Sequence, residues 1–416
     1  MIFKRISMVF MALALVTACT AQATPGLQNP TATSAVVQSS PSPLTTSTPA
    51  STYPPTETLA PSATSLPSQT VAPSITPVPG QIGPDSYPAG VNPLTGQTVA
   101  QPDLLNLPPA LISVSDFPVT ARPQAGLSKS PFVFEAYFGD GMTRFLAVQY
   151  GDLSDVGSKT LSVGPIRSGR LPWEPLRSEL GGFLLIANGD ESVLKELKNY
   201  TNVFSGINDV NSVFVDAATI QKYANQYLPV VGKPDLKGLA FSPNPPDGGK
   251  SGLYLWIPYA FLNQVIWRYD PASGVYNRWQ DNYDGLNFVK MTDRLDNVPL
   301  AFENVIVVFA YHTLLKAEKT DITLANVPQM PALLFRDGKM YEIFWSTSYV
   351  NGKVTPMRFV DAQGNPVPLK PGHTWVQIVT AGSEYFETVD STDYGTRITK
   401  KTPGSGDWVV KFIMPK

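Results

Sequence analysis

The feature that most limits how this chain can fold is a proline-rich stretch at residues 20–84. It holds thirteen prolines in sixty-five residues, the rest is mostly Ser, Thr and Ala, and its only charged side chain is Glu57. Proline lacks a backbone N–H, so it interrupts helices and central strands. The stretch also contains too few large apolar side chains to build a core. We expect a disordered stalk, up to roughly 200 Å long as polyproline II at about 3.1 Å per residue, or about 45 Å long as a flexible coil. The folded part must then lie within residues 85–416.

Residues 1–19 have the layout of a secretory signal. Lys4 and Arg5 precede an apolar run at residues 6–16 that is too short to span a bilayer comfortably. The signal ends in Val16-Thr17-Ala18-Cys19, which resembles the lipobox of bacterial lipoproteins, where cleavage precedes a lipid-bearing cysteine. We therefore expect the mature protein to be anchored in the membrane through Cys19, on the extracytoplasmic face of the cytoplasmic membrane.

The charge balance and the scarcity of reactive side chains exclude several classes of function. Lys plus Arg number 31 and Asp plus Glu 33, so no basic surplus favours nucleic-acid binding. Cys19 is the only cysteine, and once it carries a lipid it cannot act as a thiol nucleophile. The only histidines, His312 and His373, are too few for an ordinary zinc hydrolase. We expect no metal, no cofactor and no catalytic residue.

The folded region divides into two parts of different character. From residue 85 to 241, apolar runs typical of strands alternate with helix-like segments, which predicts a mixed α/β domain. The segment at residues 242–252 is rich in Pro and Gly and is predicted to be a linker. The predicted strands are residues 110–114, 132–138, 144–150 and 183–187, and the predicted helices are residues 191–200 and 216–227, the second capped by Asp216.

Beyond the linker, residues 253–416 are predicted to form a smaller, antiparallel β-rich domain, so that the whole chain is of the α+β class. Three hairpins are expected there because pairs of apolar runs flank loops that contain Gly. The pairs are residues 266–269 with 275–279, 333–336 with 340–345, and 357–360 with 374–379.

Several segments together carry a resemblance to a known family. They are NPLTGQ at 92–97, ARPQAGLSKSPFVFEAYFGDGMTRFLAV at 121–148, VGPIRSGR at 163–170, VIWRYDPASGVYNRW at 265–279, ENVIVVFAYH at 303–312 and GNPVPLKPGHTWVQIV at 364–379. The chain resembles the YerB-like bacterial lipoproteins, a two-domain family catalogued as a domain of unknown function. The resemblance implies a surface-anchored two-domain lipoprotein with a role at the cell wall, but it supplies no reaction.

The charged residues of these segments are the candidates for a ligand site. Arginine side chains bind carboxylates or phosphates in bidentate fashion, so a cluster of them is suited to a peptide carboxylate or a wall-polymer phosphate. Three of the candidates could instead form an internal ion-pair network that orients three strands, namely Arg122, Glu135 and Arg144. The full set of candidates is Arg122, Glu135, Asp140, Arg144, Arg167, Ser168 and Arg170.

These observations favour a non-catalytic, lipid-anchored envelope protein that binds a cell-wall component or a wall-synthesis or wall-remodelling protein. Aromatic side chains in the second half could stack on sugar rings or could instead pack in the core. They are Trp256, Trp267, Tyr269, Tyr276, Trp279, Tyr283, Trp345 and Trp375. Two alternatives stay open. One is a peptidoglycan hydrolase that uses Glu135 and Asp140 as paired carboxylates. The other is a solute-binding lipoprotein, which would need a cleft between two similar α/β lobes.

Overall fold

The computed structural model describes residues 80–416 except 154–159, 205, 207–208, 210 and 318. The predicted signal, Cys19 and all of the predicted stalk before residue 80 lie outside the described residues. Within the described part, no helix has the length and apolar character that crossing a membrane requires.

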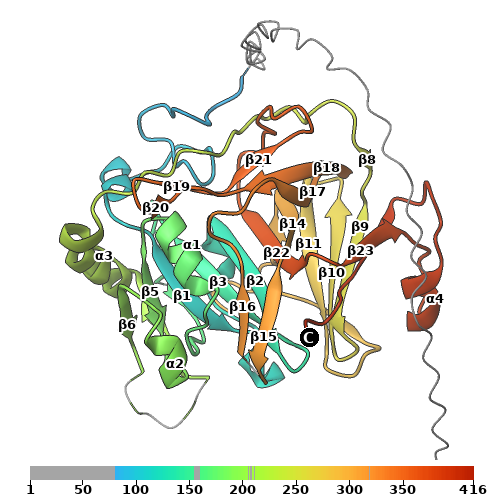
Figure 1. Ribbon diagram of the computed structural model, residues 1–416, viewed down its shortest axis with the longest axis horizontal. Helices are drawn as coiled ribbons and strands as arrows, with labels where there is room; N and C mark the ends of the chain where they lie inside the picture. The colour runs from blue at the N-terminus through green and yellow to red at the C-terminus, as the bar shows by residue number, and fades with distance from the viewer. Residues whose placement is uncertain (1–79, 154–159, 205, 207–208, 210, 318) are drawn as a thin grey trace, which may run out of the picture. The chain divides into compact units, whose positions relative to one another are not determined.

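An eleven-stranded mixed sheet organises the fold (Figure 1). Some of its strands precede residues 242–252 in the sequence and others follow them. The two groups join where β22 pairs in parallel with β14 on one side and with β2 on the other. The order across the sheet is β21 (Arg358–Val360), β18 (Lys339–Ser346), β17 (Met330–Arg336), β14 (Asn304–Ala310), β22 (Thr374–Thr380), β2 (Phe132–Gly139), β3 (Met142–Gln149), β1 (Ala110–Ser115), β5 (Phe183–Ile186) and β6 (Tyr200–Asn202), with β8 (Lys250–Ser251) beside β18.

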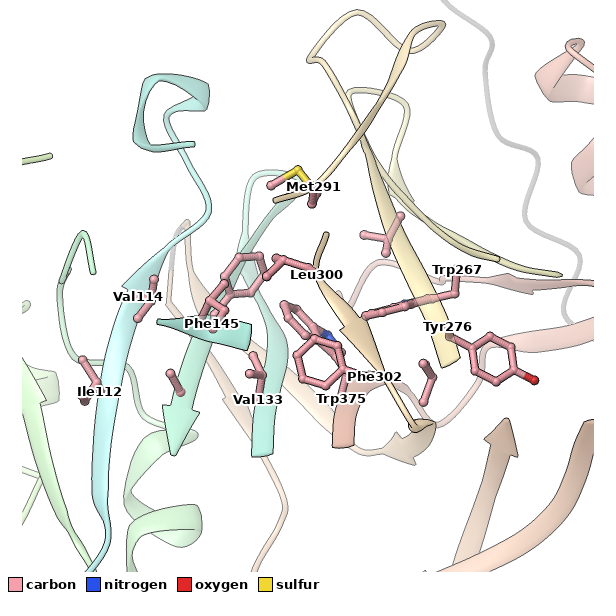
Figure 2. Packing of buried hydrophobic residues seen from close by; sticks show 14 of the residues in the cluster. Ile112, Val114, Val133, Phe145, Trp267, Tyr276, Met291, Leu300, Phe302 and Trp375 are labelled. Atoms are coloured by element: carbon pink, nitrogen blue, oxygen red, sulfur yellow. The ribbon is translucent and has the colours of Figure 1, made fainter. Parts of the chain in front are cut away.

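A second, seven-stranded sheet packs against one face of the first. Trp267 of the second sheet meets Trp375 of the first with ring centroids 5.4 Å apart, inside a shared apolar core (Figure 2). Its order is β12 (Phe288–Lys290), β11 (Val275–Asp281), β10 (Asn263–Asp270), β9 (Tyr254–Ala260), β24 (Asp407–Lys411) and β23 (Glu384–Glu387), with β13 (Ala301–Phe302) beside β11.

The remaining elements are two-stranded ribbons and α-helices. Two-stranded ribbons are formed by β15 (His312–Lys316) with β16 (Lys319–Ile322), β19 (Tyr349–Val350) with β20 (Lys353–Val354), and β4 (Ser162–Val163) with β7 (Val215–Asp216). The α-helices are α1 (Trp173–Glu179), α2 (Glu191–Leu194), α3 (Ala217–Val231) and α4 (Tyr394–Thr399). Helices α1 and α2 place Trp173, Leu176 and Val193 against the other face of the large sheet. We call this face, covered by α1 and α2, the helical face.

The predicted fold class is therefore only partly correct. The chain is rich in strands and contains few helices, and the second half supplies every strand of the seven-stranded sheet. The first half does not form an α/β domain of its own, because its strands share the eleven-stranded sheet with the second half. The reason is that β2, β14 and β22 are buried along their whole length, so each needs a neighbour on both sides to satisfy its backbone. They find those neighbours in each other.

Many of the strands, caps and hairpins predicted from local sequence patterns are confirmed. Strands β1, β2, β3 and β5 match the four predicted strands, and the Asp216 side chain accepts a hydrogen bond from Thr219 N at 2.7 Å, as expected of a helix cap. The hairpins β10–β11 and β17–β18 also form. The predicted helix at 191–200 is wrong beyond Leu194, because Tyr200 begins a strand parallel to β5.

The third predicted hairpin is wrong. Strand β21 pairs with β18, whereas β22 pairs with β14 and β2 at the centre of the sheet. The loop between the two runs, with its Gly and Pro residues, carries a turn signal that is equally compatible with a longer connection.

One buried carboxyl links the two halves on the helical face of the sheet. Glu179, the last residue of α1, is 3% exposed and accepts a hydrogen bond from the backbone N–H of Met357. Its Oε2 has no hydrogen-bond partner among the described residues. Burial raises the pKa of Glu179 to about 8, and the bond from Met357 opposes that shift.

We predict that Glu179 makes the stability of the fold depend on pH. In the folded chain this carboxyl keeps its proton up to about pH 8, while in the unfolded chain it ionises near 4.5. The folded state binds the extra proton between these values, so the free energy of unfolding falls as pH rises, by at most about 1.4 kcal/mol per pH unit.

Urea denaturation between pH 5 and 8.5 measures this slope. Glu179→Gln should be flatter than the wild type over that range, because the titrating group is gone. Glu191→Gln, which changes an exposed carboxylate paired with Lys195, should keep the wild-type slope. Equal slopes for the wild type and Glu179→Gln would contradict the prediction.

Candidate functional site

The candidate residues on β2 and β3 are divided between two faces of the sheet. Successive side chains of a strand point to opposite faces. Glu135 lies on the face that packs against the second sheet, together with Val133 and Tyr137. Arg144 pairs with Ala136 across the hairpin and therefore lies on the helical face. Glu135 and Arg144 do not belong to one network, so the three-residue ion-pair network considered from the sequence is not what forms.

Glu135 lies at the centre of a buried polar network between the two sheets. Its Oε2 lies 2.9 Å from Arg278 Nη2, 3.1 Å from the Trp375 indole N–H and 3.0 Å from Gln377 Nε2. Its Oε1 accepts a hydrogen bond from the Thr143 hydroxyl at 3.0 Å. Both Glu135 and Arg278 are fully buried. Every oxygen of Glu135 is thus occupied by a donor of the protein itself.

A second ion pair continues the network toward the surface. Asp116 Oδ1 lies 3.2 Å from Arg122 Nη2, and Asp116 Oδ2 accepts a hydrogen bond from Gln280 Nε2 at 2.7 Å. The Thr143 hydroxyl lies 2.8 Å from Asp116 Oδ2 and also reaches Glu135. Burial raises the pKa of Glu135, Arg278 opposes the shift and Asp116 adds to it. The Thr143 hydroxyl has one proton and lies within reach of two carboxyls, so it can donate to only one of them at a time.

Glu135 and Asp140 differ in their exposure, which bears on the paired-carboxylate alternative. The paired-carboxylate alternative needs two acids that reach a substrate, and Asp140 is exposed whereas Glu135 is enclosed. Among the described residues, Glu135 is thus enclosed by side chains of the protein itself, and Arg122 joins the same network through Asp116. Arg122 stacks over Phe117, with its guanidinium carbon 4.9 Å from the ring centroid.

The network supports the turn that presents Asp140. Asn263 on β10 donates hydrogen bonds to the Gly141 carbonyl at 3.0 Å and to the Thr143 hydroxyl at 3.3 Å. Asp140 and Gly141 have φ values of +50° and +76°, the conformation of the tight turn that best joins two twisted strands. A side chain at position 141 would meet Ala260 at 2.9 Å, so the turn sits directly on the second sheet.

Asp140 borders a groove of about 480 Å³ whose walls are largely apolar. Two exposed aromatic side chains face it, Phe261 at 49% exposure and Tyr283 at 54%. Phe117 and Tyr137 also line the groove, and they lie one and two residues from Asp116 and Glu135 of the buried network. The groove also includes Gly141, Met142, Ala260, Leu262, Leu314, Met414 and Pro415.

Tyr283 holds an unusual backbone conformation. Its φ is +65°, a region that bulky residues rarely occupy and that costs roughly 1–2 kcal/mol. The loop is fixed by Asp281, which accepts hydrogen bonds from Asp284 N and Gly285 N, and by Asp284, which accepts from Leu286 N and Asn287 N. The two carboxylates are therefore used as turn acceptors. Across the described residues, no group of three or more His, Cys, Asp or Glu side chains is placed to hold a metal.

The other three candidate arginines lie on the helical face of the sheet. Arg144 and Arg170 both stack on Phe138, with guanidinium carbons 4.9 Å and 4.3 Å from the ring centroid. Arg167 is half-buried, and burial lowers the pKa of its guanidinium. Its backbone N–H bonds to Ser113 O at 2.8 Å, which places the loop at the carboxyl end of β1.

Ser168 belongs to the same loop through its main chain. Its carbonyl accepts a hydrogen bond from the Ser113 hydroxyl at 2.9 Å. The candidates therefore fall into two places: Arg122, Glu135 and Asp140 at the groove and the network beneath it, and Arg144, Arg167, Ser168 and Arg170 on the opposite face.

Several residues of the network were missed from the sequence. Gln377 stands at the centre of a run that is otherwise mostly apolar or aromatic, and a polar residue at the centre of a buried strand needs a partner. That pattern could have identified Gln377. Arg278 lies in a strand that also holds Asn277 and Gln280, so no such signal marks it. Tyr283 was noted only as one of many aromatic residues, and most of the others, including Trp267 and Trp375, are fully buried.

Comparison with known proteins identifies relatives along most of the folded chain. Two models of a protein of unknown function match it, the DUF3048 N-terminal domain at residues 94–232 and the DUF3048 C-terminal domain at residues 256–376. A protein of Bacillus subtilis (strain 168) named "Putative lipoprotein YerB" is 27% identical over 304 residues, which cover 69% of this chain and 85% of the relative. The crystal structure of YerB protein from Bacillus subtilis aligns with a TM-score of 0.55 at 25% identity, covering 69% of this chain and 96% of that one.

We predict that the buried pair of Glu135 and Arg278 behaves as a unit. Removing one partner leaves the other charged and buried, so Glu135→Gln and Arg278→Met should each lower the free energy of unfolding by about 3–5 kcal/mol. The double variant should lose clearly less than the sum of the two single losses. Urea denaturation measures all three.

Asp140→Asn is the matched control, because it changes an exposed carboxylate of the same hairpin and should leave the denaturation midpoint unchanged. Additive losses in the double variant would show that Glu135 and Arg278 do not act as a pair.

Proposed function

Because the chain belongs to the DUF3048 family, we propose that it is a lipid-anchored protein of the extracytoplasmic face of the membrane that binds a carbohydrate component of the cell wall. The name of the relative YerB supports the anchor, as do Lys4, Arg5 and the apolar run that ends at Cys19. A diacyl anchor holds firmly because two acyl chains add their burial energies.

The observation that carries the binding proposal is the groove beside Asp140. Phe261 and Tyr283 present exposed aromatic rings there, and Asp140 is an exposed acid at its border. Sugar rings have apolar faces that stack on aromatic side chains and hydroxyl groups that donate to carboxylates. The strained backbone of Tyr283 supports this reading, because such residues cluster where a ligand is held.

The alternatives are supported less well. A hydrolase that uses Glu135 and Asp140 would need Glu135 to reach the substrate, and its oxygens are enclosed. A solute-binding lipoprotein would need a cleft between two separate lobes, whereas the two halves here share a sheet. If isolated cell wall is not bound, we expect the partner to be a wall-synthesis or wall-remodelling protein.

The lipid anchor is tested in cells. Cys19→Ala keeps Lys4, Arg5 and the apolar run, so export should continue while lipidation is lost. We expect the protein to leave the membrane fraction and appear in the medium, as measured by immunoblotting of both fractions. Full retention in the membrane fraction would contradict an anchor at Cys19.

Wall binding is tested by co-sedimentation of residues 20–416 with purified cell wall. Loss of an aromatic contact of about 1.4 kcal/mol weakens binding tenfold, so we expect Tyr283→Ala to raise the apparent Kd about tenfold. Asp140→Asn should weaken binding as well. Val289→Ala, which changes an equally exposed apolar residue outside the groove, should bind like the wild type.

The same assay separates the competing sites and functions. An Arg167→Ala/Arg170→Ala double variant should bind normally, and loss of binding there would move the ligand site to the helical face of the sheet. Release of soluble muropeptides would indicate a hydrolase instead. Wild-type protein that stays in the supernatant would contradict wall binding and indicate a protein partner.

A further inference from the structure

A second groove, of about 820 Å³, lies at the edge of the large sheet, away from Asp140. Strand β18 forms its floor, and the elements around it are labelled together in Figure 1. One wall is the segment at 244–250 that leads into β8. The other is the loop at 361–368 that follows β21. Nothing in the proposed wall-binding site uses this groove.

The edge of the sheet is interrupted along this floor. Strand β8 pairs with Lys339 and Met340, and β21 pairs with residues 344–346. Between them, residues 341–343 pair with β17 on one side, and no described strand pairs with them on the other. The interruption is three residues long, roughly 10 Å of strand.

The hairpin turn shows which backbone groups face the interruption. Asp337 and Gly338 have φ values of +53° and +72°, which makes a two-residue turn closed by the pair Arg336 and Lys339. In such a hairpin the two residues of the closing pair exchange backbone hydrogen bonds. Residues 339, 341 and 343 of β18 therefore bond to β17, and the residues between them direct their N–H and C=O to the opposite edge of the strand. Gly338 fits this pattern, because its carbonyl accepts a hydrogen bond from Gly252 N on the β8 side at 2.9 Å. Glu342 therefore directs its N–H and C=O into the groove.

The charges around the groove are mostly negative. Asp247, Glu342 and Asp361 line it together with Lys250, and Lys339 Nζ lies 3.3 Å from the Gly248 carbonyl in one wall. Lys250 Nζ lies 2.9 Å from Glu342 Oε1, so its charge is already compensated. The rim thus carries an acidic surplus that favours a basic partner.

We propose that this groove binds a short extended segment of a partner polypeptide that carries basic side chains. The segment adds to the sheet as a strand of about three residues, and its backbone bonds to the N–H and C=O of Glu342. Its basic side chains lie against Asp247 and Asp361. Pro246 and Pro366 in the two walls lack donors, so they confine the pairing to the interruption.

The test uses the full chain in detergent and fluorescein-labelled hexapeptides read by fluorescence anisotropy. A peptide of alternating Lys and Val should bind, and one of alternating Glu and Val should not. The Lys–Val peptide with N-methylated amides should bind at least tenfold more weakly, because it cannot donate backbone hydrogen bonds.

Matched charge reversals locate the site. Glu342→Lys should weaken binding of the Lys–Val peptide at least tenfold, because like charges then oppose each other. Glu191→Lys reverses an exposed glutamate in α2, which does not line the groove, and should change the Kd less than about twofold. Thermal melts of both variants establish that each is folded.

Three outcomes would overturn the proposal. The first is that the Lys–Val and Glu–Val peptides bind equally well, or that neither of them binds. The second is undiminished binding of the N-methylated peptide, which would remove strand addition. The third is tighter probe binding after residues 20–79 are deleted, which would mean that the groove holds the chain's own preceding segment. None of these outcomes depends on whether the chain binds cell wall.

Discussion

Strand β22 is the element on which the rest of the structure depends. All seven of its residues pair with β14, and residues 374–378 also pair with β2 from the other half of the chain. A strand buried on both faces must satisfy its backbone within the sheet, because water cannot reach it. Without β22 the first half has an unpaired central edge at β2, and the second half has one at β14.

The polar network fixes how that junction is aligned. Glu135 lies directly opposite Gln377 in the pairing of β2 with β22, and their side chains are hydrogen-bonded. A shift of one residue would turn Glu135 to the face where Phe134 and Ala136 pack against apolar neighbours. A buried ion pair adds little net stability compared with apolar packing, but it penalises every alternative register. We interpret the network as the reason that two distant segments meet in one alignment, and as the rigid base of the groove above it.

The sequence predicted what is local and missed what is distant. Alternating apolar runs located β1, β2, β3 and β5, Asp216 marked the start of α3, and Asp337-Gly338 marked a hairpin, because in each case the signal lies within a few residues. The strands that pair with β22 lie far from it in the sequence, so no local signal identifies them. The prediction that β22 pairs with β21 was therefore wrong. The same holds for the site. Glu135 was selected from the sequence as a candidate ligand or ion-pair residue, but its place in the buried network depends on Arg278 and Gln377, which are 143 and 242 residues away in the chain.

The shared sheet also determines when this protein can become folded. If the chain is exported from its N-terminus, residues 110–149 emerge long before the strand that completes their sheet. Until residue 378 arrives, β2 presents an open, apolar edge of the kind that pairs with other chains. Contacts so distant in sequence form slowly, because the intervening chain must first be closed into a loop. The nascent protein therefore has an extended interval of exposure to aggregation and proteolysis, and a truncation before β22 would leave it in that state permanently.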